Sequence, residues 1–381
     1  ASVSPFEDDT PEKQQERIER ARWDKLYFMQ TYLPHYFFAD FGDFHEEWAD
    51  LADVKNEPVL VGAPREHAKS TFFTFGDKLH KISYALRHFM LIISDTHDLA
   101  TIFVLAIRLE LEDNPRLKHD FGNLMGRTWK KDEFVTANGI KVLARGREDK
   151  VRGLKHRQYR PDDVDVDDLE NDQNVRNPKL IKQTKDWLQG TVMGSLEDGF
   201  SFRMIGNLFD HKSVLSQLIA ETDEDGAPLY ISRVYQAILD PETPDERPLW
   251  PAKWSLGRLK KKRKTMGTVA FNREMMNLCG AEDSPFREEW FRFHNLAELE
   301  VPQLIVAGFG DPSGTSGEAS DFKAVVTVGL ERATMTFRVL HAWIRHATVR
   351  ELFAALYQQK DAYGAGMVGI EKNMYEDFLH H

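Results

Sequence analysis

Apolar residues in the first half of the chain form short runs, and segments with helical spacing separate these runs. Pro58 to Val61 and Phe89 to Ser94 are typical of buried strands. The first strand is followed by helical spacing at Phe72, Phe73, Phe75 and Leu79, and the second by a helical run from Leu99 to Leu111. The alternation of strands and helices predicts an α/β domain.

The segment GAPREHAKST, Gly62 to Thr71, connects the first strand to the first helix. Backbone N–H groups of such a loop point at an anion, and the dipole of the following helix favours phosphate. We expect Lys69 to reach the β- and γ-phosphates of ATP and the Ser70 hydroxyl to ligate Mg²⁺. The usual motif has glycine where this chain has Ala63 and Ala68, so an ordinary strand-to-helix turn with a solvated lysine is the alternative.

A carboxylate cluster follows a third strand in the segment PDDVDVDDLEND, Pro161 to Asp172. A nucleotide hydrolase needs one carboxylate near the magnesium ion and another that orients the attacking water, and a strand end beside the phosphate loop supplies both. We assign Asp167 to magnesium and either Asp168 or Glu170 to the water. The alternative is a solvated acidic turn.

A further apolar strand, in the segment Phe200 to Asp210, ends at Gly206 and Asn207. Polar residues in this position sense the γ-phosphate in many ATPases. The segment therefore favours a nucleotide site over the two structural alternatives.

These three elements, in this order, resemble the ATPase domain of the tailed-bacteriophage terminase large subunit. The phosphate loop of that family often begins with arginine and lacks the usual glycines, as APREHAKS does here. FGDFHEEW, Phe41 to Trp48, stands where the family carries a base-contacting segment, RGLKHRQYRPDD precedes the acidic cluster, and IGNLF is similar to the coupling motif. The departure is that Asp163 and Asp165 interrupt a strand that is usually apolar throughout.

The resemblance implies a role for each matching residue. ATP would be bound by Pro64, Arg65, Ala68, Lys69, Ser70, Thr71 and Asp167, with Mg²⁺ held by Ser70 and Asp167. Arg65 would stabilise charge on the transferring phosphoryl group. Gly206 and Asn207 would pass the hydrolysis state to the DNA-gripping surface.

The second half of the chain predicts three strands, a helix and a returning strand. The strands are Leu304 to Gly308, Ala324 to Leu330 and Met335 to Ala342. Thr348 lies three residues before Glu351 and forms a capping box for a helix that ends near Gly364, after which Met367 to Ile370 forms the last strand. This order matches a ribonuclease-H-like fold.

Two acids follow strands of this second region, Asp311 and Glu371. On adjacent central strands they would suit two-metal phosphodiester hydrolysis with Mg²⁺ or Mn²⁺, and Asp321 is an accessory ligand in the family pattern. The alternatives are a turn residue before Pro312 and a surface acid. Nucleases of this class use a further acid after the last strand, and the chain stops at His381, so we expect an incomplete nuclease domain, whose cutting activity stays open at this point.

Composition and charge narrow the class of protein. The 381 residues suffice for two domains, and neither a membrane-length apolar run nor a signal peptide is present, which indicates a soluble intracellular protein. The single cysteine excludes internal disulfides. We expect the polar stretch from Ala1 to Gln15 to be mobile.

The net charge of −11 argues against a protein that coats DNA. Local basic patches are therefore better evidence for DNA contact than the net charge is. One patch runs from Lys141 to Pro161 and the other, RLKKKRK, from Arg258 to Lys264. DNA contact or an arginine finger in a neighbouring subunit is the hypothesis for Arg145, Arg147, Arg152, Arg157 and Arg160. A solvated charged face is the alternative for both patches.

The predicted organisation is an α/β protein in which a RecA-like P-loop ATPase domain (1–250) and a helical linker (251–300) precede an incomplete ribonuclease-H-like nuclease domain (301–381). A segment rich in proline and acid, residues 240–248, ends the first domain. The family resemblance implies ATP-driven packaging and cutting of double-stranded DNA in the host cytoplasm. The implied partners are the portal protein, the small terminase subunit and further copies in a ring, with no membrane.

Two other classes remain open at this point. A helicase-like DNA remodelling ATPase would share the phosphate loop and the acidic cluster, but it would carry a second RecA-like domain in place of the nuclease. A docking or structural protein with a degenerate nucleotide site would explain Ala63 and Ala68.

Overall fold

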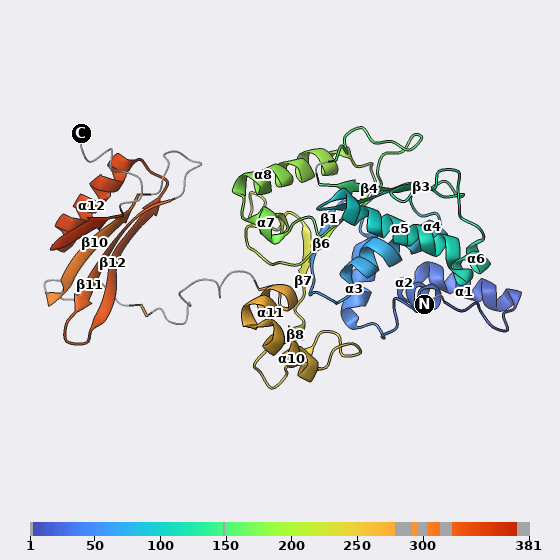
Figure 1. The fold of residues 1–381 in the computed structure, drawn as a ribbon, viewed down its shortest axis with the longest axis horizontal. Coiled ribbons are helices and arrows are strands. Elements are labelled where there is room, and N and C mark those ends of the chain that lie inside the picture. Colours follow the sequence, from blue (N-terminus) through green and yellow to red (C-terminus); the bar gives the residue numbers. More distant parts are fainter. Residues whose placement is uncertain are drawn as a thin grey trace. The chain divides into compact units, whose positions relative to one another are not determined.

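The computed structural model describes residues 3–147, 149–278, 292, 293, 295, 303–312 and 322–371. The chain divides into two compact units, Ala1–Arg287 and Glu288–His381 (Figure 1). Strands and helices alternate in the first unit, and the predicted α/β class is confirmed. Among the described residues, no helix combines the length and the apolar character that crossing a membrane requires.

The first unit contains a seven-stranded sheet in the order β3-β4-β2-β5-β6-β1-β7. β3 is antiparallel to β4, and the other neighbouring strands are parallel to each other. The strands are β1 (Pro58–Gly62), β2 (Phe89–Ser94), β3 (Glu133–Val135), β4 (Lys141–Gly146), β5 (Asp163–Asp167), β6 (Ser201–Gly206) and β7 (Ile231–Val234). Because the parallel strands share one direction, their carboxyl ends meet at one edge, where α/β proteins bind ligands.

Helices pack on both faces of this sheet. One core cluster joins Val59 and Val61 to the N-terminal helices and to α4 and α5, and the other joins Leu60 to α8 and α9. Side chains that alternate along a strand therefore enter different cores. The helices and helical turns, in chain order, are α1 (Pro11–Trp23), α2 (Lys25–Tyr32), α3 (Asp43–Asp53), η1 (Thr71–Gly76), α4 (Asp77–Ser83), α5 (His97–Asp113), α6 (Pro115–Phe121), α7 (Asp172–Val175), α8 (Pro178–Trp187), η2 (Leu188–Val192), η3 (Met193–Ser195) and α9 (Val214–Ile219).

The run from Leu229 to Leu239 is divided into two strands. It forms β7 and then the short β8 (Ile238–Leu239), which pairs with β9 (Arg247–Pro248). Two helices follow, α10 (Leu256–Met266) and α11 (Thr268–Met275). Although both lie in the predicted linker, they bury Leu259, Phe271 and Met275 in the core of the first unit.

The N-terminal residues are ordered by packing, so the expected mobility of residues 3–15 is wrong. The Thr10 hydroxyl caps α1 by accepting from the Lys13 N–H. The Arg17 guanidinium carbon lies 3.7 Å from the ring centroid of Phe6. A cation over an aromatic face is attractive, and these contacts hold the segment against the domain.

Asp163 and Asp165 face a buried network of ion pairs between β5, β6 and α4. The Arg203 Nε lies 2.6 Å from the Asp165 Oδ1, and the Lys78 Nζ lies 2.8 Å from the Asp165 Oδ2. The Lys81 Nζ lies 2.8 Å from the Asp163 Oδ2. Alternation along β5 turns Val164 and Val166 into the opposite core. The acids that interrupt the expected apolar strand are therefore paired, as buried charges must be.

The second unit contains a four-stranded sheet in the order β12-β11-β10-β13. β10 (Ile305–Asp311), β11 (Lys323–Glu331) and β12 (Thr336–Arg345) form an antiparallel meander, and β13 (Met367–Ile370) returns parallel to β10. Helix α12 (Val349–Tyr363) lies beside this sheet (Figure 1). It has the expected Thr348–Glu351 capping box and packs Leu352 and Leu356 with Val325. The predicted order of elements is confirmed.

Candidate nucleotide site

The phosphate loop leaves β1 at Gly62 and enters a helix at Lys69. The Ala63 N–H donates to the Gly206 carbonyl oxygen at 3.0 Å, which continues the pairing of β1 with β6. Glu66 and Ala68 both have left-handed backbone, with φ of 63° and 68°. This conformation is the one glycine adopts easily, so Ala68 takes the shape of the usual glycine without being one.

Lys69 and Ser70 lie against the ends of the two neighbouring motifs. The Lys69 Nζ donates to the Asn207 Oδ1 at 2.6 Å and lies 3.8 Å from the Asp168 Oδ1. The Ser70 Oγ donates to the Asp167 Oδ1 at 3.0 Å. Three segments that are far apart in sequence therefore meet at the carboxyl edge of β1, β5 and β6.

The helix after the loop differs in form from the prediction. Residues 71–76 make a π-helical turn before α4 continues. The turn brings the Thr74 hydroxyl to the Asp167 Oδ2, with a donor-to-acceptor distance of 2.8 Å. Asp167 thus accepts from the helix through both carboxylate oxygens. π-helical turns occur frequently at functional sites.

Burial changes the acidity of two of the predicted carboxylates. Burial, followed by the charge of Asp168, raises the pKa of Asp167 to about 7, while Lys69 and the two hydroxyl donors oppose the rise. Burial raises the pKa of Glu170 to about 7 as well. The Glu170 Oε2 accepts from the Val214 N–H at 2.7 Å. The side chain of Asp168 is 60% exposed.

A cavity of about 340 Å³ opens at this edge of the sheet. Its volume falls in the range of small-molecule sites. Arg65, Lys69, Asp168, Glu170, Gly206 and Asn207 are among the lining residues, whereas Pro64, Ala68, Ser70, Thr71 and Asp167 are not. The cavity wall thus includes Lys69 and both acids that could orient water, Asp168 and Glu170. Asp167, which does not line the cavity, is fully buried.

Glu274 is a lining residue that sequence reasoning missed. Its carbonyl oxygen accepts from the Arg65 N–H and from the Asn207 Nδ2, both at 2.8 Å. Its carboxylate Oε2 lies 3.5 Å from the Arg65 Nη1. Helix α11 therefore joins the phosphate loop to the end of β6. No motif marks Glu274, because only the packing of α11 on the domain brings it there.

The donor set at the head of the loop suits a hard cation. The Ser70 Oγ, at the start of a helix, is adjacent to the Asp167 Oδ1, at the end of β5. Mg²⁺ prefers oxygen ligands from one or two protein groups together with substrate phosphates. The residues present fit the predicted ion.

In the second unit, Asp311 and Glu371 lie at matching ends of paired strands. Gly310 of β10 pairs with Ile370 of β13, and the Glu371 N–H donates to the Gly310 carbonyl oxygen at 3.0 Å. Asp311 and Glu371 each follow one of the paired residues directly. The strands are adjacent, as expected, although β13 lies at the edge of the sheet among the described residues. Asp321 lies outside the described residues.

Bacteriophage large terminases are among the solved structures that resemble this chain. The HK97 large terminase matches 93% of this chain and 74% of its own, with 15% identity and a TM-score of 0.48. The large terminase of a thermophilic bacteriophage, in complex with ADP, matches 89% of this chain and 80% of its own, with 8% identity and a TM-score of 0.40. The same thermophilic phage protein in complex with ATP-γ-S has 9% identity and a TM-score of 0.38, and it covers 90% of this chain and 79% of its own.

These neighbours are of the class that the sequence motifs predicted. No family model matches the chain, and no curated protein matches it either.

The arginines of the first basic patch occupy different environments. Arg147 pairs with Asp95, with the Nε 3.2 Å from the Oδ1, and Asp95 lines the cavity. Arg145 donates to the carbonyl oxygens of Ala144 and Lys150. The other three, Arg152, Arg157 and Arg160, are exposed. Their assignment to DNA contact or to a neighbouring subunit stays a prediction.

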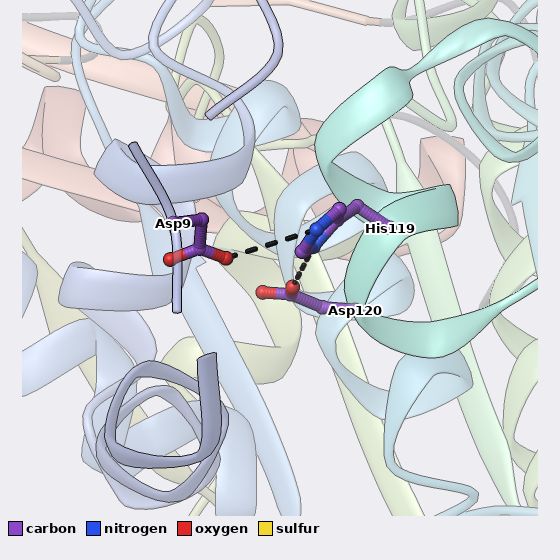
Figure 2. Close-up of side chains that lie close together, drawn as sticks. All are labelled: Asp9, His119 and Asp120. Carbon is purple, nitrogen blue, oxygen red and sulfur yellow. Dashed lines mark hydrogen bonds and ion pairs between the residues drawn. The ribbon is translucent and has the colours of Figure 1, made fainter. Parts of the chain in front are cut away.

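A separate group of acids and histidine lies between the N-terminal segment and α6. Asp9, His119 and Asp120 approach closely enough to hold a metal ion, as Figure 2 shows. However, the Arg17 guanidinium already pairs with both carboxylates, at 2.8 Å from the Asp9 Oδ2 and 2.7 Å from the Asp120 Oδ2. A cation is thus in place, and the group anchors the N-terminal segment to α6.

Proposed function

We propose that the first unit binds and hydrolyses Mg²⁺–ATP. The observation that carries this proposal is the meeting of Lys69 and Ser70 with Asp167 and Asn207 at the carboxyl edge of a parallel sheet. Phosphoryl transfer to water requires a lysine, a hydroxyl, a buried carboxylate and a polar residue at a strand end. All four lie together here beside a cavity of about 340 Å³.

Each residue has a role in this proposal. The loop N–H groups and Lys69 bind the β- and γ-phosphates. Ser70 and Asp167 hold the magnesium ion, which neutralises charge on the phosphate oxygens. Asp168 or Glu170 orients the attacking water, and Arg65 stabilises the charge that spreads over the transferring group.

Asn207 is placed to report whether the γ-phosphate is present. Its Oδ1 accepts from Lys69 and its Nδ2 donates to the Glu274 carbonyl oxygen. Phosphate competes for the Lys69 ammonium, so binding and hydrolysis change the partner that the Asn207 amide has. This change of hydrogen-bond partner is the first step by which residues outside the site would respond to ATP hydrolysis.

We propose that ATP turnover drives double-stranded DNA into a viral procapsid. The support is the resemblance of the phosphate loop, the acidic cluster and the IGNLF segment to the terminase large subunit, together with the arrangement of a P-loop unit before a mixed-sheet unit. The proposed partners are the portal protein, the small terminase subunit and further copies of this chain in a ring.

We propose metal-dependent cutting of DNA as the activity of the second unit. The supporting observation is that Asp311 and Glu371 follow residues paired between β10 and β13. Two carboxylates at neighbouring strand ends suit Mg²⁺ or Mn²⁺, which activate water and stabilise the leaving oxygen. The antiparallel meander of β10 to β12 also disfavours the helicase alternative, which requires a second RecA-like domain with a parallel sheet.

The test of the nucleotide site is the Lys69→Ala variant of the full chain. We expect ATP turnover, measured with and without duplex DNA, to fall by roughly 10²-fold or more, because a preorganised cation at the transferring phosphate is lost. The control is Lys118→Ala on α6, an exposed lysine of the same unit. Thermal unfolding of both variants checks that the fold is intact.

A measurement of nucleotide binding distinguishes this proposal from the docking-protein alternative, in which the nucleotide site is degenerate. Binding of a fluorescent ATP analogue to the wild-type chain does not depend on assembly with a portal. A wild-type chain that binds no nucleotide and hydrolyses none would show that the site is degenerate.

A further inference from the structure

Helix α10 presents an unusual concentration of positive charge. Its sequence, LGRLKKKRKTM, contains six lysines and arginines and no acid. Within the part of the chain that the structure describes, two of the six pair with carboxylates, Lys260 with Glu246 and Lys262 with Glu66. The other four have no carboxylate within ion-pair distance among those residues: Arg258, Lys261, Arg263 and Lys264.

Three of these cations form a stripe along one side of the helix. Arg258, Lys261 and Lys264 are spaced by three residues, so their side chains are neighbours on the helix surface, and all three are exposed. The stripe is about 9 Å long, from the rise of 1.5 Å per residue. Leu259, on another side, is fully buried and fixes the helix to the domain. The stripe is therefore a rigid row of charge on a protein whose net charge is −11.

The same helix and the segment just before it contact Glu66 of the phosphate loop. The Lys262 Nζ lies 2.6 Å from the Glu66 Oε1, and the Lys253 Nζ donates to the Glu66 carbonyl oxygen at 2.6 Å. Glu66 is one of the two loop residues with left-handed backbone. Trp254 lies between these elements: its ring stacks on His67 of the loop at 6.2 Å, and the Lys262 Nζ lies 5.1 Å from its centroid.

We propose that the Arg258–Lys261–Lys264 stripe of α10 binds the phosphate backbone of duplex DNA, and that Lys262 links this surface to the phosphate loop through Glu66. The inference rests on the proposed function, because it assumes a protein that couples ATP to DNA. DNA phosphate beside the stripe competes with Glu66 for the Lys262 ammonium. Release of Glu66 then alters the loop that holds the nucleotide.

A row of lysines and arginines selects phosphate without reading sequence. Such contacts release counterions, so the affinity for DNA depends steeply on salt and each contact contributes about 0.9 to the slope of log K against log salt. The surface therefore suits a protein that moves along DNA of any sequence.

The first test compares two charge-matched double variants of the full chain. Lys261→Gln/Lys264→Gln removes two stripe charges, and Lys118→Gln/Lys182→Gln removes two exposed charges from α6 and α8. Binding of a short fluorescein-labelled duplex is measured from about 50 to about 200 mM salt. We expect the slope of the stripe variant to fall by about 2 and that of the control to stay at the wild-type value.

Two results overturn different statements. Equal slopes for the stripe variant and the control show that α10 does not bind the duplex, while the ATPase proposal stands. A wild-type chain that binds ATP but no duplex overturns the DNA-coupled function itself, and the inference falls with it.

The second test uses Lys262→Gln to ask whether the link to the loop operates. Turnover of ATP is measured with and without duplex DNA at a concentration that saturates binding. We expect the ratio of the two rates to approach one in this variant, because Glu66 is free in both conditions. A ratio equal to that of the wild-type chain overturns the link. Lys118→Gln, which touches neither the loop nor α10, must keep the wild-type ratio.

Discussion

Among single residues, Ala68 takes the left-handed backbone that glycine usually takes at this position of the expected phosphate loop. Its φ of 68° costs about 1–2 kcal/mol for a residue with a Cβ atom. The residues that follow hold the loop in place through the Lys69–Asn207 and Ser70–Asp167 hydrogen bonds. A strained backbone persists where surrounding contacts determine it, and such strain gathers at functional sites.

Asp311 gives the residue-scale prediction for the second unit. We expect Asp311→Asn to weaken Mn²⁺ binding roughly tenfold or more, because a charged ligand becomes a neutral one. Isothermal titration calorimetry of the full chain measures the affinity and the number of ions bound. Asp361→Asn, an exposed acid on α12, is the control. Equal binding by Asp311→Asn and the control would remove Asp311 from the metal site.

At the scale of elements, β5 combines an apolar face with a charged one. Val164 and Val166 pack in one core, while Asp163 and Asp165 on the other face pair with Lys78, Lys81 and Arg203, all of them buried. The network ties the strand that carries Asp167 to α4, which continues the helix of Ser70. Replacing one member removes part of the compensation for the remaining buried charges, in a medium that penalises free charge.

The variant Asp165→Val restores the apolar pattern that this strand was expected to have. We nevertheless expect it to lower the free energy of unfolding by about 3–5 kcal/mol, because Arg203 and Lys78 lose a carboxylate partner while they remain buried. Urea unfolding of the first unit measures the loss.

The double variant Asp165→Val/Lys78→Met controls for the excess positive charge. It removes one of the two cations that lose a carboxylate partner and should recover part of the lost stability. If Asp165→Val alone is as stable as the wild-type chain, the network contributes nothing to this strand.

At the scale of the whole molecule, the two compact units have separate sheets and separate cores. We expect two unfolding transitions in calorimetry, and Mg²⁺–ADP should raise the temperature of only one. At a nucleotide concentration of about 100 times Kd, linkage predicts a gain of about 2.7 kcal/mol for the unit that binds it.

Lys69→Ala identifies the transition that belongs to the nucleotide-binding unit. In that variant, we expect the shift produced by Mg²⁺–ADP to disappear and the other transition to stay where it is. A single transition that moves as a whole would mean that the units unfold together.

Local signals in the sequence were enough to predict the order of elements and the loop between β1 and the following helix. Local periodicity predicts the strands that end near Ala63 and Asp167. The capping box at Thr348 depends on a contact between residues three apart, which a single sequence also displays. The order of β10, β11, β12, α12 and β13 follows from the same local signals.

Only the tertiary structure decided which distant residues complete the site. Glu274 joins Arg65 to Asn207, Lys262 joins α10 to Glu66, and Asp163 and Asp165 find cations on α4 and β6. These pairs depend on how helices pack across a sheet, and their residues are separated by stretches of chain that carry no motif. Burying a charge is unfavourable only where water has been excluded, and a partner of opposite charge offsets this free-energy cost. Such pairing therefore arises only in the folded core.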